Sequence, residues 1–109
     1  MATGRLGAED VLATTYTTLY TVPSSTFTVA AVSICNRNAT DINVRLAVTP
    51  TAGPSAPANG EFIEYDVTIS GNGVLERTGI VLDAGKTISV YSDTANVSAV
   101  AFGIETSTV

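Results

Sequence analysis

The sequence predicts an all-β fold, a single antiparallel β-sandwich of Greek-key or jelly-roll type with about seven or eight strands. Three observations predict this fold. Short runs rich in Thr, Val, Ile and Tyr alternate between apolar and polar residues. Turn-forming residues interrupt these runs at intervals of about ten residues. The helical period of 3.6 residues is almost absent. Short strands joined by frequent turns are typical of two packed antiparallel sheets.

The strand segments can be placed one by one along the chain. They are 12–22, Phe27–Cys35, Ile42–Thr49, Glu61–Ile69, Val74–Leu82, Thr87–Ser92 and Asn96–Glu105. In Ile42–Thr49 apolar and polar residues alternate most regularly. We expect the face that carries Ile42 and Val44 to be turned toward the core. Glu61–Ile69 also alternates, which places Tyr65 on the same face as its aliphatic residues.

The segment Phe27–Cys35 is apolar on both of its faces. Phe27 and Val29 begin one face, whereas Ala30 and Val32 begin the other. A strand that is apolar on both sides is typical of the centre of a sheet that is covered on both faces. We therefore expect this strand to be buried on both sides.

The remaining segments are expected to be turns, a loop and an arm. The Asn72-Gly73 pair is suited to a tight hairpin. Residues 50–60, PTAGPSAPANG, predict a long loop, and long loops often carry function or contacts. Residues 1–12 are expected to form an N-terminal arm that is ordered only if something holds it. Residues 13–109 are then the β-sandwich domain.

Composition excludes several classes of partner. The formal net charge is -5, and the five basic residues are scattered along the chain, so no basic footprint for nucleic acid is present. No stretch is long and apolar enough to predict a membrane partner. Only 14% of the residues are charged, which favours a surface that is partly covered by another protein.

The single cysteine and the first residues predict synthesis in a reducing cytoplasm. One cysteine cannot form an internal disulfide, and the N-terminal residues lack the apolar core of a signal peptide. The glycosylation sequons Asn38-Ala39-Thr40 and Asn96-Val97-Ser98 are therefore interpreted as chance occurrences in a chain rich in Thr, Ser and Asn.

The sequence offers little for catalysis, so we expect no enzyme activity, no cofactor and no metal. The chain has no histidine, which removes the commonest general base and metal ligand. Cys35 has no histidine to activate it and is interpreted as structural. Glu64 and Asp66 lie two residues apart on one predicted strand face, and a paired-acid or calcium site there is conceivable. The favoured interpretation is an ordinary solvated strand face.

Four stretches, in this order, resemble the small β-sandwich structural proteins of tailed bacteriophages. They are LYTVP at Leu19–Pro23, ICNRNAT at Ile34–Thr40, EYDVTISGN at Glu64–Asn72 and GIVLDAGKTISVYS at Gly79–Ser92. The resemblance covers roughly residues 12–105, and its motifs are strand and turn patterns without a catalytic residue. It implies a virion protein, made in the host cytoplasm, that binds itself and other virion proteins.

Within that resemblance the expected function is a capsid cement, or decoration, protein. Such a protein binds the outer surface of the major capsid shell and stabilises it, and a homotrimer is the expected oligomer. The alternative is a tail, neck, baseplate or fibre component. The expected partner contacts are Arg5, Leu6, Glu9, Asp10, Arg37, Pro54 and Pro57.

A carbohydrate-binding module or adhesin is a third hypothesis, from a different class of protein. Stacking of a sugar needs exposed flat aromatic rings, and Tyr65 and Tyr91 are the side chains whose mutation would test it. Most aromatic residues, however, occupy alternating positions that predict burial in the core. The sequence therefore favours the structural role over the carbohydrate site.

Overall fold

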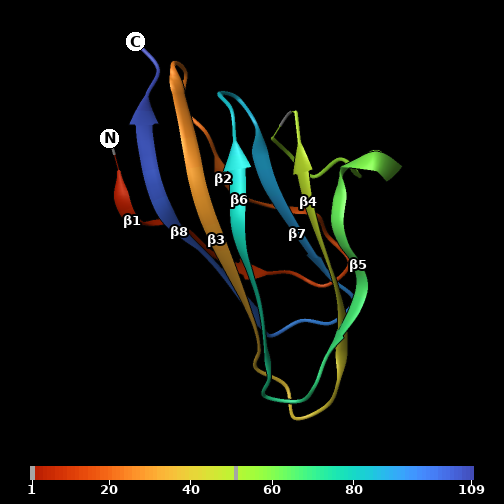
Figure 1. Ribbon diagram of the computed structural model, residues 1–109. Coiled ribbons are helices and arrows are strands. Elements are labelled where there is room, and N and C mark those ends of the chain that lie inside the picture. The colour runs from red at the N-terminus through yellow and green to blue at the C-terminus, as the bar shows by residue number, and fades with distance from the viewer. Residues whose placement is uncertain (1, 51) are drawn as a thin grey trace.

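The structure is a computed structural model that describes residues 2–50 and 52–109. Its strands are β1 (Thr3–Val11), β2 (Thr17–Thr21), β3 (Thr26–Asn36), β4 (Ile42–Thr49), β5 (Phe62–Ile69), β6 (Val74–Leu82), β7 (Thr87–Ser92) and β8 (Val97–Ser107), with a short 3-10 helix η1 (Asn59–Glu61) before β5. The strands form two four-stranded sheets that pack face to face (Figure 1). The predicted all-β sandwich is confirmed.

The strand order is that of a jelly roll. Sheet A has the order β1-β8-β3-β6, and sheet B has the order β2-β7-β4-β5. The first half of the chain therefore pairs with the second half as β1 with β8, β2 with β7, β3 with β6 and β4 with β5, all antiparallel. Successive pairs alternate between the two sheets. The chain can therefore be described as one long antiparallel ribbon that is rolled into a sandwich.

The core lies between the sheets and is mainly aliphatic. Its largest fully buried side chains are Ile34, Ile42, Leu46, Leu82 and Ile88. Burial of each such side chain contributes about 1.5–3 kcal/mol relative to full exposure. The regular alternation predicted for β4 is confirmed at its start, since every second residue from Ile42 to Leu46 is buried.

Strand β3 is not covered on both faces, so that prediction is wrong. Ala30 and Val32 are buried in the core, but Phe27 and Val29 are 37% and 43% exposed. The strand does lie inside its sheet, between β8 and β6. In a two-layer sandwich, however, only one side of each sheet meets the other sheet. Apolar residues on both sides therefore place one apolar row on the molecular surface.

The segment expected to be an arm is instead strand β1, at the edge of sheet A. Thr3–Val11 pairs antiparallel with β8 from Thr3 opposite Ile104 to Val11 opposite Val97. Val11 is buried in the core. Backbone hydrogen bonds to β8 order this segment within the chain itself, and they need no external partner.

The Asn72-Gly73 turn does not close a hairpin within one sheet. The strands on either side, β5 and β6, belong to sheet B and sheet A. The turn itself is present, because Asn72 has a φ of 58° and the amide of Gly73 donates to the carbonyl of Ser70 at 2.8 Å. Local turn chemistry was predicted correctly, but it does not determine whether the flanking strands pair.

Buried Asn36 joins two turns at one end of the sandwich. Its Nδ2 donates to the carbonyls of Thr40, Ile69 and Ser70 at 2.9, 3.2 and 3.1 Å, and its Oδ1 accepts from the amide of Asn38 at 2.9 Å. The side chain thus satisfies backbone groups that the strands leave unpaired. The polar stretch Asn36–Thr40 is a structural connection between the β3–β4 loop and the β5–β6 turn.

A second polar connection joins the two sheets near the chain ends. The hydroxyl of Tyr20, in β2, forms hydrogen bonds with Thr28 in β3 at 2.9 Å and with the carboxylate of Glu105 in β8. The backbone amide of Ala2 also donates to Glu105 at 2.9 Å. The pKa of Tyr20 is raised to about 12, mainly by burial and also by its hydrogen bond to Glu105. The same hydrogen bond lowers the pKa of Glu105.

Candidate functional site

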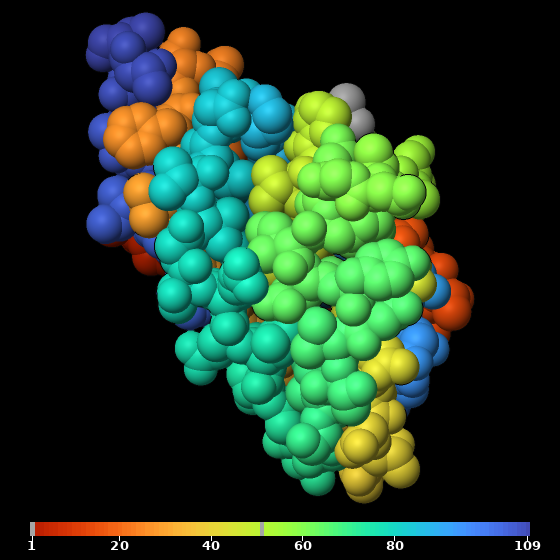
Figure 2. All heavy atoms as spheres, turned by 45° about the vertical axis from the view of Figure 1, so that its right-hand side comes forward, coloured from red at the N-terminus to blue at the C-terminus, as the bar shows by residue number. Residues whose placement is uncertain are grey.

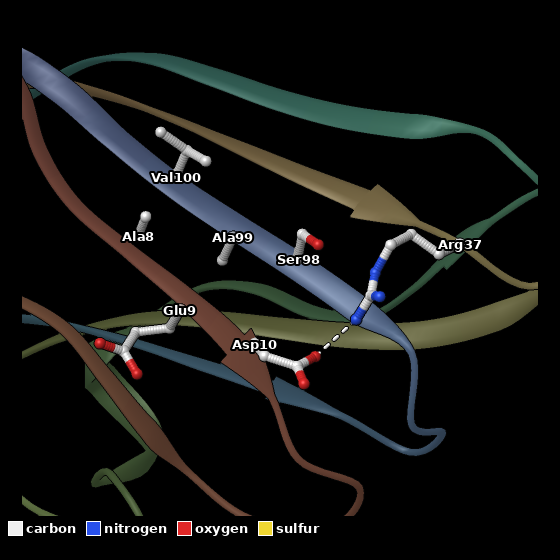
Figure 3. A pocket seen from close by; sticks show the side chains of 7 residues that line it. All are labelled: Ala8, Glu9, Asp10, Arg37, Ser98, Ala99 and Val100. Atoms are coloured by element: carbon white, nitrogen blue, oxygen red, sulfur yellow. Dashed lines mark hydrogen bonds and ion pairs between the residues drawn. The ribbon is translucent and has the colours of Figure 1, made fainter.

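The end of β1 borders a shallow depression on sheet A. Its lining comes from β1 (Ala8, Glu9 and Asp10), β8 (Ser98, Ala99 and Val100) and Arg37 in the loop after β3 (Figure 3). Arg37 reaches over β8 and pairs with Asp10 at 2.5 Å, whereas Glu9 points away from this pair. Both charged partners are largely exposed, so the ion pair adds little stability.

The residues expected to contact partners are therefore spread over several places. Arg5 is exposed on β1, directly opposite Phe102 on β8. Leu6 is half-buried and packs against the core. Pro54 is exposed and Pro57 is half-buried in the loop that leads from β4 to η1. Of the predicted set, Glu9, Asp10 and Arg37 line one depression, and Asp10 and Arg37 form an ion pair there.

The outer side of sheet A carries a continuous apolar surface, which we call the apolar face. Val29 on β3 lies opposite Ile104 on β8 and opposite Val81 on β6, so the three side chains form a row across three strands. Val81 is 70% exposed and Ile104 is 55% exposed. The face is completed by exposed aromatic side chains, Phe27 and Phe102. Figure 2 shows side chains of β8, β3 and β6 side by side at its upper left.

The outer side of sheet B carries a different group, which we call the Arg45–tyrosine cluster. Its members are Tyr16, Arg45, Phe62, Tyr65, Asp66 and Tyr91. The guanidinium carbon of Arg45 lies 4.3 Å from the centroid of the Tyr65 ring and 4.8 Å from that of Tyr91. The Tyr16 and Tyr91 centroids are 4.6 Å apart. Arg45 therefore lies among aromatic rings that come from different strands of the sheet.

Hydrogen bonds fix Arg45 in this position. Its Nε donates to Oδ1 of Asp66 at 2.7 Å, and its Nη1 donates to the hydroxyl of Tyr16 at 2.8 Å. These bonds raise the pKa of Arg45, so its charge is retained across the ordinary pH range. Because Asp66 supplies a carboxylate at the same place, the charge of the pair is balanced locally.

A β-bulge in β5 points Tyr65 outward, against the prediction that it shares a face with the aliphatic residues of that strand. The register between β4 and β5 shifts between Val44 and Leu46, and Asp66 has a φ of 53° at the shift. A bulge sets two residues of one strand against one of its partner and redirects side chains. Tyr65 and Asp66 consequently both reach Arg45. Alternation in the sequence did not signal this irregularity.

The expectation that most aromatic residues are buried is also wrong. Tyr20 belongs to the core, but Phe27, Tyr65 and Phe102 are exposed, and Tyr16, Phe62 and Tyr91 are half-buried. The core is filled by aliphatic side chains, and the outer side of each sheet carries the rings. Period-two alternation predicts which residues share a face but not which face meets the other sheet.

The possible catalytic groups are held apart. Glu64 pairs with Arg77 at 2.7 Å, whereas Asp66 pairs with Arg45, because the bulge separates their directions. The predicted shared face of the two acids is therefore wrong. Cys35 is a half-buried free thiol. Within residues 2–50 and 52–109, no group of three or more Cys, Asp or Glu side chains is arranged to hold a metal ion.

Comparison with protein-family models, with curated proteins and with solved structures gives no significant match. In the part of the chain that the structure describes, no helix has the length and apolar character needed to cross a membrane.

Proposed function

We propose that this chain is a structural protein of a tailed-phage particle, where it acts as a cement protein on the outer surface of the capsid. The observation that carries the proposal is the apolar face of sheet A. The resemblance of the four sequence stretches to phage structural proteins supplies the biological setting. The jelly roll is compatible with it, since this architecture recurs in viral capsid domains, although a fold alone does not assign a function.

The apolar face has the chemistry of a protein interface. Val29, Val81 and Ile104 form a row across three strands, and all three are exposed in the isolated chain. Contiguous exposed apolar surface is unusual on a monomer and marks sites of association. The β1 residue Arg5 lies opposite Phe102 and supplies a charge at the rim of the apolar face. We assign the face to contact with a neighbouring virion protein.

Binding to the assembled shell would stabilise it by mass action. A protein that binds the assembled lattice, but not its free subunits, shifts the equilibrium toward the lattice. We also propose a homotrimer, since a closed ring would cover the edge strands β1 and β6 of sheet A. Sedimentation velocity of the purified chain tests the oligomer separately from the capsid contact.

The apolar face is tested by a charged double variant, Val29→Glu with Ile104→Glu. Both side chains are exposed, so the variant should fold, but burying two carboxylates against a partner should abolish binding. The measurement is co-sedimentation with phage particles that lack this chain. The matched control is Thr68→Glu, an exposed β5 residue on the other sheet. Unchanged binding of the folded double variant would contradict the proposal.

Copy number separates the cement role from the tail alternative. A cement protein should be present in a number that scales with the major capsid protein. A tail, neck, baseplate or fibre component should be present at a few copies per particle. Quantitative mass spectrometry of purified particles gives this ratio, and imaging of intact particles gives the location.

A further inference from the structure

We propose that the Arg45–tyrosine cluster on sheet B is a binding site for a neutral saccharide, with Tyr65 as the ring on which the sugar stacks. This inference is independent of the role proposed for sheet A. Tyr65 is 57% exposed, and it is the one large apolar side chain on this sheet, among the described residues, that is so exposed. The nonpolar C–H face of a sugar ring packs well on a tyrosine ring.

The cluster is held in place before any ligand binds. The Phe62 and Tyr65 rings meet edge to face with centroids 4.9 Å apart, and the guanidinium of Arg45 packs against Tyr65 at 4.3 Å. Asp66, with its φ of 53°, fixes the bulge that directs Tyr65 outward. Since these rings are already ordered, binding would require little further loss of side-chain freedom.

Polar atoms surround the stacking ring, as sugar hydroxyls require. The carboxylate of Asp66 and the hydroxyl of Tyr16 are both in contact with Arg45, and Asp66 remains about half exposed. Carboxylate oxygens accept hydrogen bonds, and tyrosine hydroxyls both donate and accept them. Figure 2 shows β5 residues in green at the front, bordered on the right by the segment before β2 in red-orange and by the end of β7 in blue.

The charge of the cluster selects a neutral sugar over an acidic one. Arg45 is the cation of the cluster, and it is already paired with Asp66 at 2.7 Å. The chain as a whole has a formal net charge of -5. An acidic saccharide would therefore meet no free positive charge at the site and an unfavourable overall field.

The contrast with the apolar face favours a saccharide over a protein partner on this sheet. The exposed side chains of the apolar face include Val29, Val81 and Ile104, whereas the cluster exposes a tyrosine ring beside an ion pair. Aliphatic side chains fit the dry centre of a protein interface. Aromatic rings with hydrogen-bonding groups at their edges suit a ligand that has both C–H faces and hydroxyls.

The test begins with an array of neutral glucans, mannans and galactans together with sulfated and uronate-containing oligosaccharides. We expect binding to neutral members, and the array member that gives the strongest signal is then titrated by calorimetry. Tyr65→Ala should weaken that binding by about tenfold or more. The matched control is Phe102→Ala, which removes a similarly exposed ring from the other sheet and should leave binding unchanged.

A conservative variant keeps the test interpretable if Tyr65→Ala perturbs the fold. Tyr65→Trp retains a flat ring and should retain binding. Absence of binding to every neutral member, equal binding by a folded Tyr65→Ala variant, or binding to acidic members alone would each overturn the proposal. Loss of particle association by Tyr65→Ala with no saccharide bound would instead identify a protein interface, and the proposal would be wrong.

Discussion

The two outer faces of the sandwich differ, although the two sheets serve one core in the same way. Each sheet turns aliphatic side chains inward. Outward, sheet A exposes an uncharged row of Val29, Val81 and Ile104, whereas sheet B exposes Tyr65 beside the pair of Arg45 and Asp66. The demands of folding act mainly on the inner sides. The difference between the outer sides therefore points to different partners.

The largest expected difference in the free energy of unfolding is between substitutions on the inner side and on the outer side of β3. Ile34→Ala should lower the free energy of unfolding by about 3 kcal/mol, because it leaves a cavity in the fully buried core. Val29→Ala, on the same strand, should change it by about 0.5 kcal/mol or less, because Val29 faces solvent. Urea denaturation measures both values. Equal losses would contradict the one-sided burial of β3 and the exposure of the apolar face.

The next largest effect on the free energy of unfolding is expected where β8 approaches β3 closely, beneath the apolar face. A Cβ on Gly103 would lie 2.1 Å from the carbonyl oxygen of Val29, so Gly103→Ala must push the strands apart. We expect a loss of about 2–3 kcal/mol in denaturation experiments. Gly60→Ala is the control, since nothing lies within 4 Å of its added Cβ. A stable Gly103→Ala protein would show that the strands can separate easily.

The polar connection between the sheets predicts a pH dependence. The pKa of Glu105 is lowered, chiefly by the hydrogen bond from Tyr20, so its contribution is present above the unfolded-state pKa and is lost as pH falls through the folded-state value. Glu105→Gln should therefore flatten the decline in stability between neutral and acidic pH. Unfolding curves at several pH values measure this slope, and an unchanged slope would argue against the connection.

Tyr20, the hydrogen-bond partner of Glu105, predicts a loss of stability at alkaline pH. The pKa of Tyr20 is raised to about 12, chiefly by burial, so its contribution is complete below its ordinary pKa and is lost as pH rises toward about 12. Tyr20→Phe should remove that alkaline decline, although it also lowers stability at neutral pH by removing the bond to Thr28. Absorbance titration of the folded protein reports the tyrosine ionisation directly.

The smallest expected effect concerns the bulge beneath the Arg45–tyrosine cluster. Asp66→Ala removes the ion pair with Arg45 and places alanine at a φ of 53°, so we expect a loss of about 1 kcal/mol. Asp66→Gly also removes the pair but tolerates this φ, and it should lose less. Chemical denaturation of the two variants separates conformational strain from pairing. A larger loss for glycine would contradict that assignment.

Much of the fold was predictable because strand and turn chemistry is local. The alternation at the start of Ile42–Thr49 and the turn at Asn72-Gly73 follow from period-two patterning and residue conformational preferences. The candidate sites were less predictable. Tyr65 and Tyr91 are the rings expected for a carbohydrate site, yet the alternation of the strands predicts most aromatic residues in the core, and the structure places most of them on the outer sides of the sheets.

The fold class, the approximate strand positions and the shortage of charge can be inferred from the amino-acid sequence, because they depend on composition and on near neighbours along the chain. Three features follow only from the three-dimensional arrangement: residues 3–11 form strand β1, β3 has one exposed apolar side, and Arg45 lies between Tyr65 and Tyr91. Each of these depends on which distant strands pair and on where a bulge shifts the register. Such pairings are settled by the packing of the two sheets, which no local pattern encodes.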